Sequence, residues 1–399
     1  MKTQTYPAID WNACIQLRRD LHRHPELGFE EFRTSQIVAQ RLRSLGYSVT
    51  EGIAGTGLVG SFTKGQSKRS IGLRADMDAL PIHEQSPVDW ASQTPGIMHA
   101  CGHDGHTAIL LAAAEIIAKQ CDFDGTVHLI FQPAEELGGG GGARRMLEEG
   151  LFERFPCDSI FALHNMPGWP TGHFLFREGA MMASSDRVVI TFKGKGGHAA
   201  VPHHSIDPTI PAASTILALQ SIVSRTVDPL DSVVISLGTL HAGATYNVIP
   251  DEVRLELSVR TFSATLRDRL ETQITQLCEA QAESLGAQAH VDYQRGYPVL
   301  INTTEATQQA CATAKTVFGA ERVQTDIPPL MGSEDFAFML QERPGCYLLI
   351  GNGQIGETHT TTGLTHCMVH NPGYDFNDDC LPPAATFWAE LVKKMLPVA

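Results

Sequence analysis

The sequence predicts an α/β protein in which a mostly parallel sheet flanked by helices carries an inserted ferredoxin-like α+β domain. In the first 185 residues, short apolar runs typical of strands alternate with helical patterns, and this order predicts a parallel sheet. Between residues 186 and 296 the predicted order becomes β-α-β-β-α-β, which is ferredoxin-like. The α/β alternation then resumes. We therefore expect a discontinuous larger domain, residues 1–185 and 297–399, interrupted by a small domain of residues 186–296.

The individual elements follow from apolar spacing. Helical spacing over residues 11–45 is interrupted at His24-Pro25, and because proline disfavours helix for the residue before it, the sequence predicts two helices here. In the rest of the larger domain we expect strands at 70–73, 125–131, 159–163 and 346–350, and helices at 106–119, 143–149, 305–318 and 383–395. In the small domain we expect strands at 187–192, 232–240, 253–260 and 287–293, and helices at 207–225 and 264–285.

Composition and charge exclude several classes of protein. The chain has 399 residues, of which 43% are hydrophobic, enough to bury the cores of two domains. Thirty basic and forty-four acidic residues give a net charge of −14, which would repel nucleic acid and anionic membranes. No run approaches the roughly 18 apolar residues of a membrane helix, and the first 14 residues contain no apolar run, so we expect neither a membrane helix nor a secretory leader. Nine scattered cysteines indicate reduced thiols, so we expect a cytoplasmic protein.

A metal-ligand pattern occupies residues 99–106, His-Ala-Cys-Gly-His-Asp-Gly-His. In an extended segment Cys101 and His103 would point to the same side of the chain. Thiolate and imidazole together suit ions such as Zn, Co, Ni or Mn. The alternative is that the cysteine packs as a small hydrophobic residue while the histidines cap the following helix.

Two adjacent carboxylates, Glu135 and Glu136, follow the strand expected at 125–131, and α/β folds bind ligands at such strand ends. A cation would offset their mutual repulsion, with one glutamate as ligand and the other as general base. A solvated loop is the alternative. The glycines at 138–142 formally match a dinucleotide-binding motif, but the glutamates would repel a pyrophosphate, so we interpret these glycines as a turn.

Further candidate histidines lie at the end of the strand expected at 159–163 and near the C-terminus. His164 ends that strand, where it is a candidate ligand or a structural residue. Residues 365–374 contain His366, Cys367 and His370, and spacing alone does not choose among them. Because Asn371-Pro372 marks a turn, it would present His370 from a loop.

Three residues of the small domain could recognise a substrate. His198 lies in a glycine-rich turn, Asn247 precedes Val-Ile-Pro, and Arg260 ends a strand. A guanidinium binds a carboxylate through two parallel hydrogen bonds, which suits recognition of a carboxylate substrate. From the sequence alone, all three could equally be solvated surface residues.

Taken in order, these motifs resemble peptidase family M20, specifically the branch of hippurate hydrolases, N-acyl-amino-acid amidohydrolases and auxin-conjugate hydrolases. The resemblance runs nearly end to end. It is carried by LHRHPELGFE at 21–30, LRADMDALP at 73–81, HACGHDGH at 99–106, QPAEE at 132–136, GGHAA at 196–200, NVIP at 247–250, MGSEDF at 331–336 and HNPGYDFN at 370–377.

The resemblance implies two divalent metal ions per subunit, held by Cys101, His103, Glu136, His164 and His370. It implies that Glu135 is the catalytic base, that His198 of the inserted lid domain stabilises the oxyanion, and that Asn247 and Arg260 contact substrate. It also implies a homodimer or homotetramer assembled through the inserted domain. The chain departs from the family in its longer glycine run, which is preceded by an additional Leu137.

The implied reaction is hydrolysis of the amide bond of a small N-acyl amino acid, especially a hippurate-like N-aroyl substrate, to a carboxylic acid and a free amino acid. Two ions (Zn, Mn, Co or Ni) would lower the pKa of a shared water, and Glu135 would take its proton. An auxin-conjugate, N-acetyl-amino-acid or dipeptide hydrolase is an alternative within the family. The same residues would also suit a cysteine hydrolase using Cys101 with His103 or His106, or a catalytically silent binding protein that keeps the metals or captures an acyl amino acid.

Overall fold

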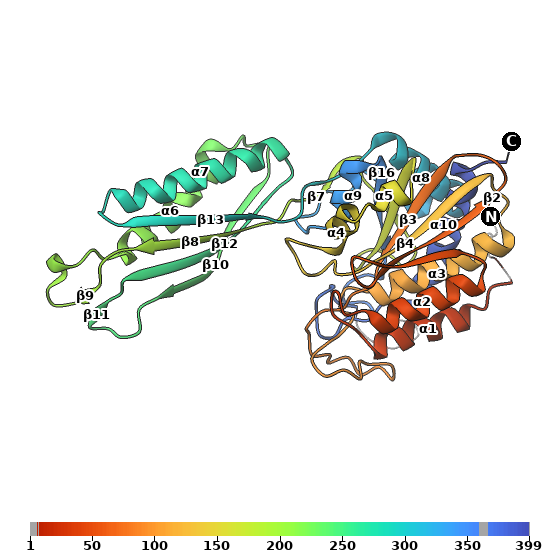
Figure 1. The fold of residues 1–399 in the computed structure, drawn as a ribbon, viewed down its shortest axis with the longest axis horizontal. Helices are drawn as coiled ribbons and strands as arrows, with labels where there is room; N and C mark the ends of the chain where they lie inside the picture. The colour runs from red at the N-terminus through yellow and green to blue at the C-terminus, as the bar shows by residue number, and fades with distance from the viewer. Residues whose placement is uncertain (1–5, 7, 359–365, 399) are drawn as a thin grey trace. The chain divides into compact units, whose positions relative to one another are not determined.

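The structure is a computed structural model that describes residues 6, 8–358 and 366–398. The chain forms two compact units (Figure 1). The first unit comprises Met1–Gly179, Ile301–Pro328 and Asp335–Ala399, and the second comprises Ala180–Leu300 and Pro329–Glu334. The small domain expected at residues 186–296 lies within the second unit, which also includes residues on either side of that range.

The first unit is built on an eight-stranded sheet in the order β1-β2-β4-β3-β5-β16-β6-β15. Its central strands β4, β3, β5 and β16 run parallel to one another, which confirms the predicted fold class. The strands are β1 (Ser48–Ile53), β2 (Gly57–Lys64), β3 (Ser70–Asp76), β4 (Gly125–Gln132), β5 (Ser159–Met166), β6 (Phe174–Phe176), β15 (Val323–Thr325) and β16 (Gly345–Gly351). The β1–β2 hairpin was not expected, because β1 is polar and largely exposed and so lacks an apolar run.

Helices cover both faces of this sheet (Figure 1). One face is covered by α1 (Trp11–Arg23), α2 (Phe32–Ser44), α3 (His103–Gln120), α8 (Thr304–Phe318) and α10 (Leu381–Met395). The other is covered by α4 (Gly142–Glu148), α5 (Leu151–Arg154) and α9 (Phe336–Glu342). The helix α3 is buried along most of its length, because alanine, isoleucine and leucine surround its axis.

The carboxyl ends of the parallel strands meet at one edge of the sheet. There β3 ends at Asp76, β4 ends at Gln132 just before the two glutamates, and β5 carries His164 near its end. Open α/β sheets bind ligands at this edge. The sheet order therefore places three of the sequence motifs beside one another.

The second unit has a four-stranded antiparallel sheet in the order β10-β12-β8-β13, with α6 and α7 packed together over its core. The chain order is the ferredoxin-like β-α-β-β-α-β. Its elements are β8 (Asp186–Lys193), α6 (Thr209–Ser221), β10 (Val233–Ala242), β12 (Glu252–Thr261), α7 (Ala264–Glu283) and β13 (Gln288–Arg295). The helix expected at 207–225 is thus shorter, and a π-helical turn, Ile222–Thr226, follows it.

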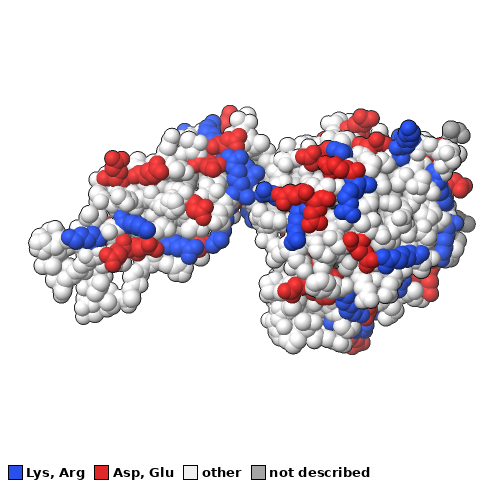
Figure 2. All heavy atoms as spheres, in the orientation of Figure 1, with Lys and Arg blue, Asp and Glu red and all other residues white. Residues whose placement is uncertain are grey.

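Shorter elements complete the chain. Two further two-stranded sheets pair β9 (Gly197–His198) with β11 (Val248–Ile249), and β7 (Gly179–Met182) with β14 (Leu300–Asn302). No helix within residues 8–358 and 366–398 is both long and apolar enough to cross a membrane. On the face shown in Figure 2, acidic and basic side chains are interspersed on both units, so the negative net charge is not gathered in one patch there.

Candidate metal centre

The five ligands that the resemblance implies lie together at the carboxyl edge of the first unit's sheet. Sγ of Cys101 lies 3.3 Å from Nε2 of His164. Oε1 of Glu136 lies 3.2 Å from Nε2 of His370 and 4.0 Å from Nε2 of His103. Potential ligand atoms gather in groups whose members all lie within 4.8 Å of one another. One group is Cys101 with His103 and His164, and another is Cys101 with Glu136 and His370. Cys101 belongs to both groups, an arrangement suited to two neighbouring cations.

The local geometry around Cys101 differs from the expectation of an extended segment. Gly102 has a φ of +91°, and α3 begins at His103, so a tight turn at the start of the helix brings the thiol and the imidazole together. A Cβ at Gly102 would lie 2.4 Å from Oδ1 of Asn165. Glycine is therefore required both for the left-handed backbone and for the close approach of Asn165.

The structure also distinguishes among the C-terminal candidates. His370 lies in a turn with a φ of +63°, and its N–H donates to the carbonyl of Ala100 over 2.7 Å. This bond holds His370 beside the segment that carries Cys101, although its side chain is 50% exposed. His366 packs instead against Gly353.

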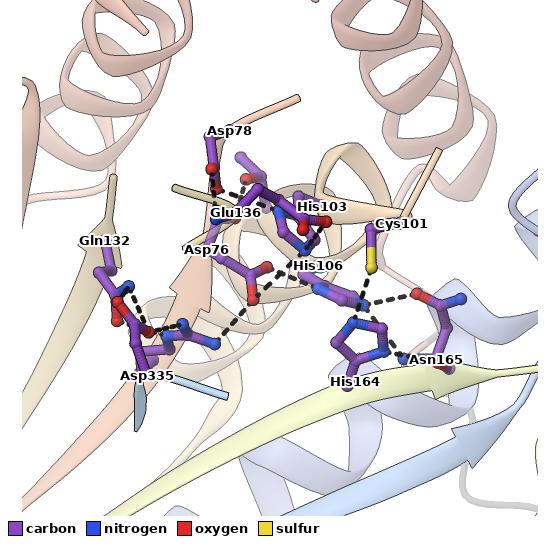
Figure 3. A network of polar contacts seen from close by, with 12 residues as sticks. Asp76, Asp78, Cys101, His103, His106, Gln132, Glu136, His164, Asn165 and Asp335 are labelled. Atoms are coloured by element: carbon purple, nitrogen blue, oxygen red, sulfur yellow. Dashed lines mark hydrogen bonds and ion pairs between the residues drawn. The ribbon is translucent and has the colours of Figure 1, made fainter. Parts of the chain in front are cut away.

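Hydrogen bonds orient the candidate ligands (Figure 3). Asp78 contacts two of them: Oδ1 lies 3.2 Å from Nδ1 of His103, and Oδ2 accepts a 2.9 Å hydrogen bond from the backbone N–H of Glu136. Nδ1 of His164 donates to the carbonyl of Asn165 over 2.6 Å. In both histidines the Nε2 atom is then the one left to bind a cation, as is usual when a second group holds the other ring nitrogen.

A buried charged network lies beneath the site. Arg74 bonds to Asp76, Gln132 and Asp335 over 2.7 to 3.0 Å. Nδ1 of His106 lies 2.6 Å from Oδ1 of Asp76. Asp76 also forms a third group of potential metal ligands with His103 and His106.

The carboxylates dominate the electrostatics of this site. Burial alone would lower the pKa of His103, but the negative charges of Asp76 and Asp78 outweigh it and raise the pKa to about 10. Burial alone would raise the pKa of Asp76, but the positive charges of His103 and Arg74 hold that pKa well below its ordinary value. The site thus holds an excess of negative charge that a cation would neutralise.

Asp76, Asp78 and the residues of the Arg74 network were not among the candidates predicted from the sequence. The available signal was the pair of aspartates in Arg74-Ala-Asp-Met-Asp78 at the end of an apolar strand, where a buried charge needs a partner.

The donor set fits divalent cations. Among the described side chains, Nε2 of His103 and Oε1 of Glu136 are buried and make no hydrogen bond, although Oε1 of Glu136 lies at ion-pair distance from Nε2 of His370. Buried polar atoms normally make hydrogen bonds, so two buried atoms that make none in one region indicate a ligand there. One thiol, three imidazoles and a carboxylate match the preferences of borderline transition metals such as Zn, Co, Ni or Mn.

Comparison with known proteins identifies the family. Residues 72–394 match the model of "Peptidase family M20/M25/M40". The chain belongs to this family. It is 42% identical over 381 residues to the hippurate hydrolase of Campylobacter jejuni, covering 96% of each chain. It is 37% identical to the "IAA-amino acid hydrolase ILR1-like 4" of Arabidopsis thaliana, covering 97% of this chain and 86% of that one.

A solved M20 structure agrees with the fold. The YXEP protein of Bacillus subtilis, described as a dinuclear metal binding peptidase, superposes with a TM-score of 0.82 at 32% identity, covering 98% of this chain and 99% of that one. This chain is therefore an M20 hydrolase acting on amides. The resemblance and the fold class expected from the sequence are both confirmed.

The second unit of this M20 enzyme carries the remaining predicted residues. Strand β9, which contains His198, pairs with β11, and the N–H of Ala199 donates to the carbonyl of Asn247 over 3.1 Å. His198 and Asn247 are therefore neighbours. Arg260 lies near the end of β12, where its Nη1 donates to the carbonyl of Met331 over 3.0 Å.

Proposed function

We propose that this M20 enzyme is a dinuclear metal-dependent amidohydrolase that cleaves N-acyl amino acids, with hippurate-like N-aroyl substrates preferred. The observation that carries the proposal is the convergence of Cys101, His103, Glu136, His164 and His370 on one region of the first unit. The 42% identity to a hippurate hydrolase over nearly the whole chain supports the choice of acyl group.

Glu135 is proposed as the general base. It is only 7% exposed and shares a group of potential ligand atoms with His103 and Glu136. Divalent ions bound by the five ligands would acidify the attacking water. Glu135 then accepts the proton of that water and delivers it to the nitrogen of the leaving amino acid.

His198, Asn247 and Arg260 are proposed to act on the substrate. Nδ1 of His198 accepts a 3.0 Å hydrogen bond from the backbone N–H of Ala200, so the ring proton is on Nε2. This tautomer is a hydrogen-bond donor, as stabilisation of a developing oxyanion requires. The guanidinium of Arg260 and the amide of Asn247 would bind the α-carboxylate of the amino acid.

Exposed apolar side chains beside the metal ligands support an apolar acyl group. Leu137, which directly follows Glu136, is 56% exposed, and Met368, two residues before His370, is 44% exposed. Large apolar side chains flanking convergent polar groups are typical of a ligand site for a molecule with an apolar part.

The cysteine-hydrolase alternative is disfavoured. Burial, with the charges of Glu136 and Glu135, raises the pKa of the Cys101 thiol well above its ordinary value. A nucleophilic cysteine needs the opposite shift, because the thiolate is the reactive form. Moreover, the ring nitrogen at hydrogen-bond distance from Sγ of Cys101 is Nε2 of His164, at 3.3 Å.

Self-association through the second unit is proposed as well. Strand β10 is an edge strand whose residues from Ser236 onward are exposed, including Leu237 and Leu240. Exposed apolar edge strands tend to pair with another chain. Light scattering should show a dimer or tetramer, and Leu240→Lys should dissociate it, whereas a monomeric wild type would contradict the proposal.

Free cysteines support a reducing compartment such as the cytoplasm. All nine cysteines of the chain are unpaired, and eight of them are buried.

A substrate panel tests the proposed reaction. Protein stripped with a chelator is reloaded separately with Zn, Mn, Co or Ni and assayed on hippurate, N-acetyl amino acids, an auxin conjugate and dipeptides. We expect no activity without metal, activity after reloading, and the highest kcat/KM on hippurate. Activity that survives chelation would contradict the metal mechanism, and a metal-loaded enzyme inactive on every amide would support a binding protein.

A further inference from the structure

The buried carboxylate of Glu31 reaches the turn that carries the catalytic glutamates. Glu31 immediately precedes α2, yet its side chain does not cap that helix. Its Oε1 accepts a 2.8 Å hydrogen bond from the backbone N–H of Ala134, and its Oε2 accepts one from the hydroxyl of Thr56. The side chain is fully buried, so it binds protein groups rather than solvent.

Ala134 has an unusual backbone. Its φ is +54°, in the left-handed region that residues with a Cβ seldom adopt and that is held only by surrounding contacts. Ala134 is fully buried, and a Cβ on Gly28 would lie 3.0 Å from its Cα, so the chain segment before Glu31 packs directly on it. With water excluded, Glu31 is the group that satisfies the Ala134 N–H.

Two carboxylates then hold the turn on either side of Glu135. Glu31 accepts from the N–H of Ala134, and Asp78 accepts from the N–H of Glu136 over 2.9 Å. The backbone of Glu135 lies between these two bonds. Its direction is therefore set by side chains from two distant segments of the sequence.

We propose that Glu31 is a positioning residue that sets the Ala134 turn and thereby aims Glu135 at the substrate and Glu136 at the metal. The inference deepens the proposed function, because it takes Glu135 as base and Glu136 as ligand. Burial raises the pKa of Glu31, and the hydrogen bonds from Thr56 and Ala134 oppose that rise, so both donors favour the carboxylate.

Variants at Glu31 separate the hydrogen bond from the charge. Glu31→Gln keeps an oxygen that accepts from Ala134 and removes the charge, whereas Glu31→Ala removes the acceptor. Misplacing a catalytic group by about 1 Å costs roughly a hundredfold in rate, so we expect kcat of Glu31→Ala to fall by about that factor with KM nearly unchanged. Glu31→Gln should retain kcat within about threefold. The control is Glu30→Ala, which removes the adjacent exposed carboxylate and should behave as wild type.

A Co²⁺ titration provides a readout that does not depend on turnover. Visible absorption and calorimetry should show weaker binding at one of two sites in Glu31→Ala and wild-type binding in Glu31→Gln. If Glu31→Ala does not fold, Glu31→Asp, which keeps the charge but shortens the side chain, should show the same losses. Wild-type kcat and Co²⁺ binding in Glu31→Ala or Glu31→Asp, or a Glu31→Gln variant as impaired as Glu31→Ala, would overturn the proposal. An inactive wild type would instead refute the proposed function, and the Co²⁺ arm would still test Glu31.

Discussion

Oδ1 of Asp78 lies 3.2 Å from Nδ1 of His103, in the buried site at the carboxyl edge of the sheet. The same carboxylate also holds the backbone N–H of Glu136 through Oδ2. Asp78 therefore supports two proposed ligands at once, so we expect its replacement to lower metal affinity more than it lowers the stability of the fold.

Asp78→Asn should weaken metal binding. The substitution places an amide N–H against either His103 or Glu136, each of which already donates to Asp78. Loss of such a supporting contact typically costs about 10–100-fold in metal affinity, and we expect that loss in a calorimetric titration with Zn²⁺. Asp89→Asn, at an exposed position, is the matched control. Equal affinities in the two variants would show that Asp78 does not support the ligands.

Glu135→Gln should keep the metal and lose turnover. The amide is nearly isosteric but cannot accept a proton, so kcat should fall by about 10²–10⁴-fold. Elemental analysis should still find two metal ions per chain. Glu136→Gln should instead lose metal, because it changes a proposed ligand. Near-normal turnover in Glu135→Gln would show that Glu135 is not the general base.

His198→Ala should lower kcat by about 10²–10³-fold, the effect of removing one oxyanion donor in other hydrolases. The metal content should not change, because His198 belongs to the second unit and the proposed ligands belong to the first. His203→Ala, an exposed histidine of the same unit, serves as control. A His198→Ala enzyme with wild-type kcat would remove His198 from the reaction.

His22 should make the stability of the protein depend on pH. This buried ring lies 2.8 Å from Oδ2 of Asp104 and 3.2 Å from Oε1 of Glu84. Burial alone would lower its pKa, but Asp104 and Glu84 outweigh burial and raise the pKa to about 9. Folding thus favours the protonated ring, so this stabilisation is fully present below about pH 6.5 and is lost as the pH rises through about 9.

The difference between the pKa of His22 in the folded protein and in the unfolded chain corresponds to up to about 3 kcal/mol of unfolding free energy. Urea unfolding in a chelator should therefore show wild type losing more stability between pH 6 and pH 9.5 than His22→Gln does. His83→Gln, at an exposed position, should follow wild type. Parallel pH profiles for wild type and His22→Gln would contradict the assignment.

Several elements could be predicted from the sequence because their signals are local. The apolar runs of β4 and β5 are long enough to mark buried strands, and the spacing along α7 marks a helix. Cys101 with His103, and Glu135 with Glu136, stand close together in the chain, so each pair could be recognised as a candidate site without knowledge of the fold.

Other features have no local signal. Asp78 and Glu31 look like ordinary acidic residues in the sequence, and their roles arise from contacts with His103 and Ala134 that are distant along the chain. The expectation of an extended Cys101–His103 segment was wrong because the left-handed Gly102 starts the helix there. Periodicity describes regular elements and contains no information about a single left-handed residue.

The sequence by itself determined the family, the α/β class, and the chemical types of the candidate ligands, because these depend on residue identity and spacing. The tertiary structure decided which atoms meet. It groups His370 rather than His366 with Glu136, it pairs Cys101 with His164, and it leaves Nε2 of His103 facing the ligand region. These outcomes depend on the order of strands in the sheet, which brings the ends of β3, β4 and β5 together. Since that order is set by the packing of the whole unit, no single segment of the sequence contains it.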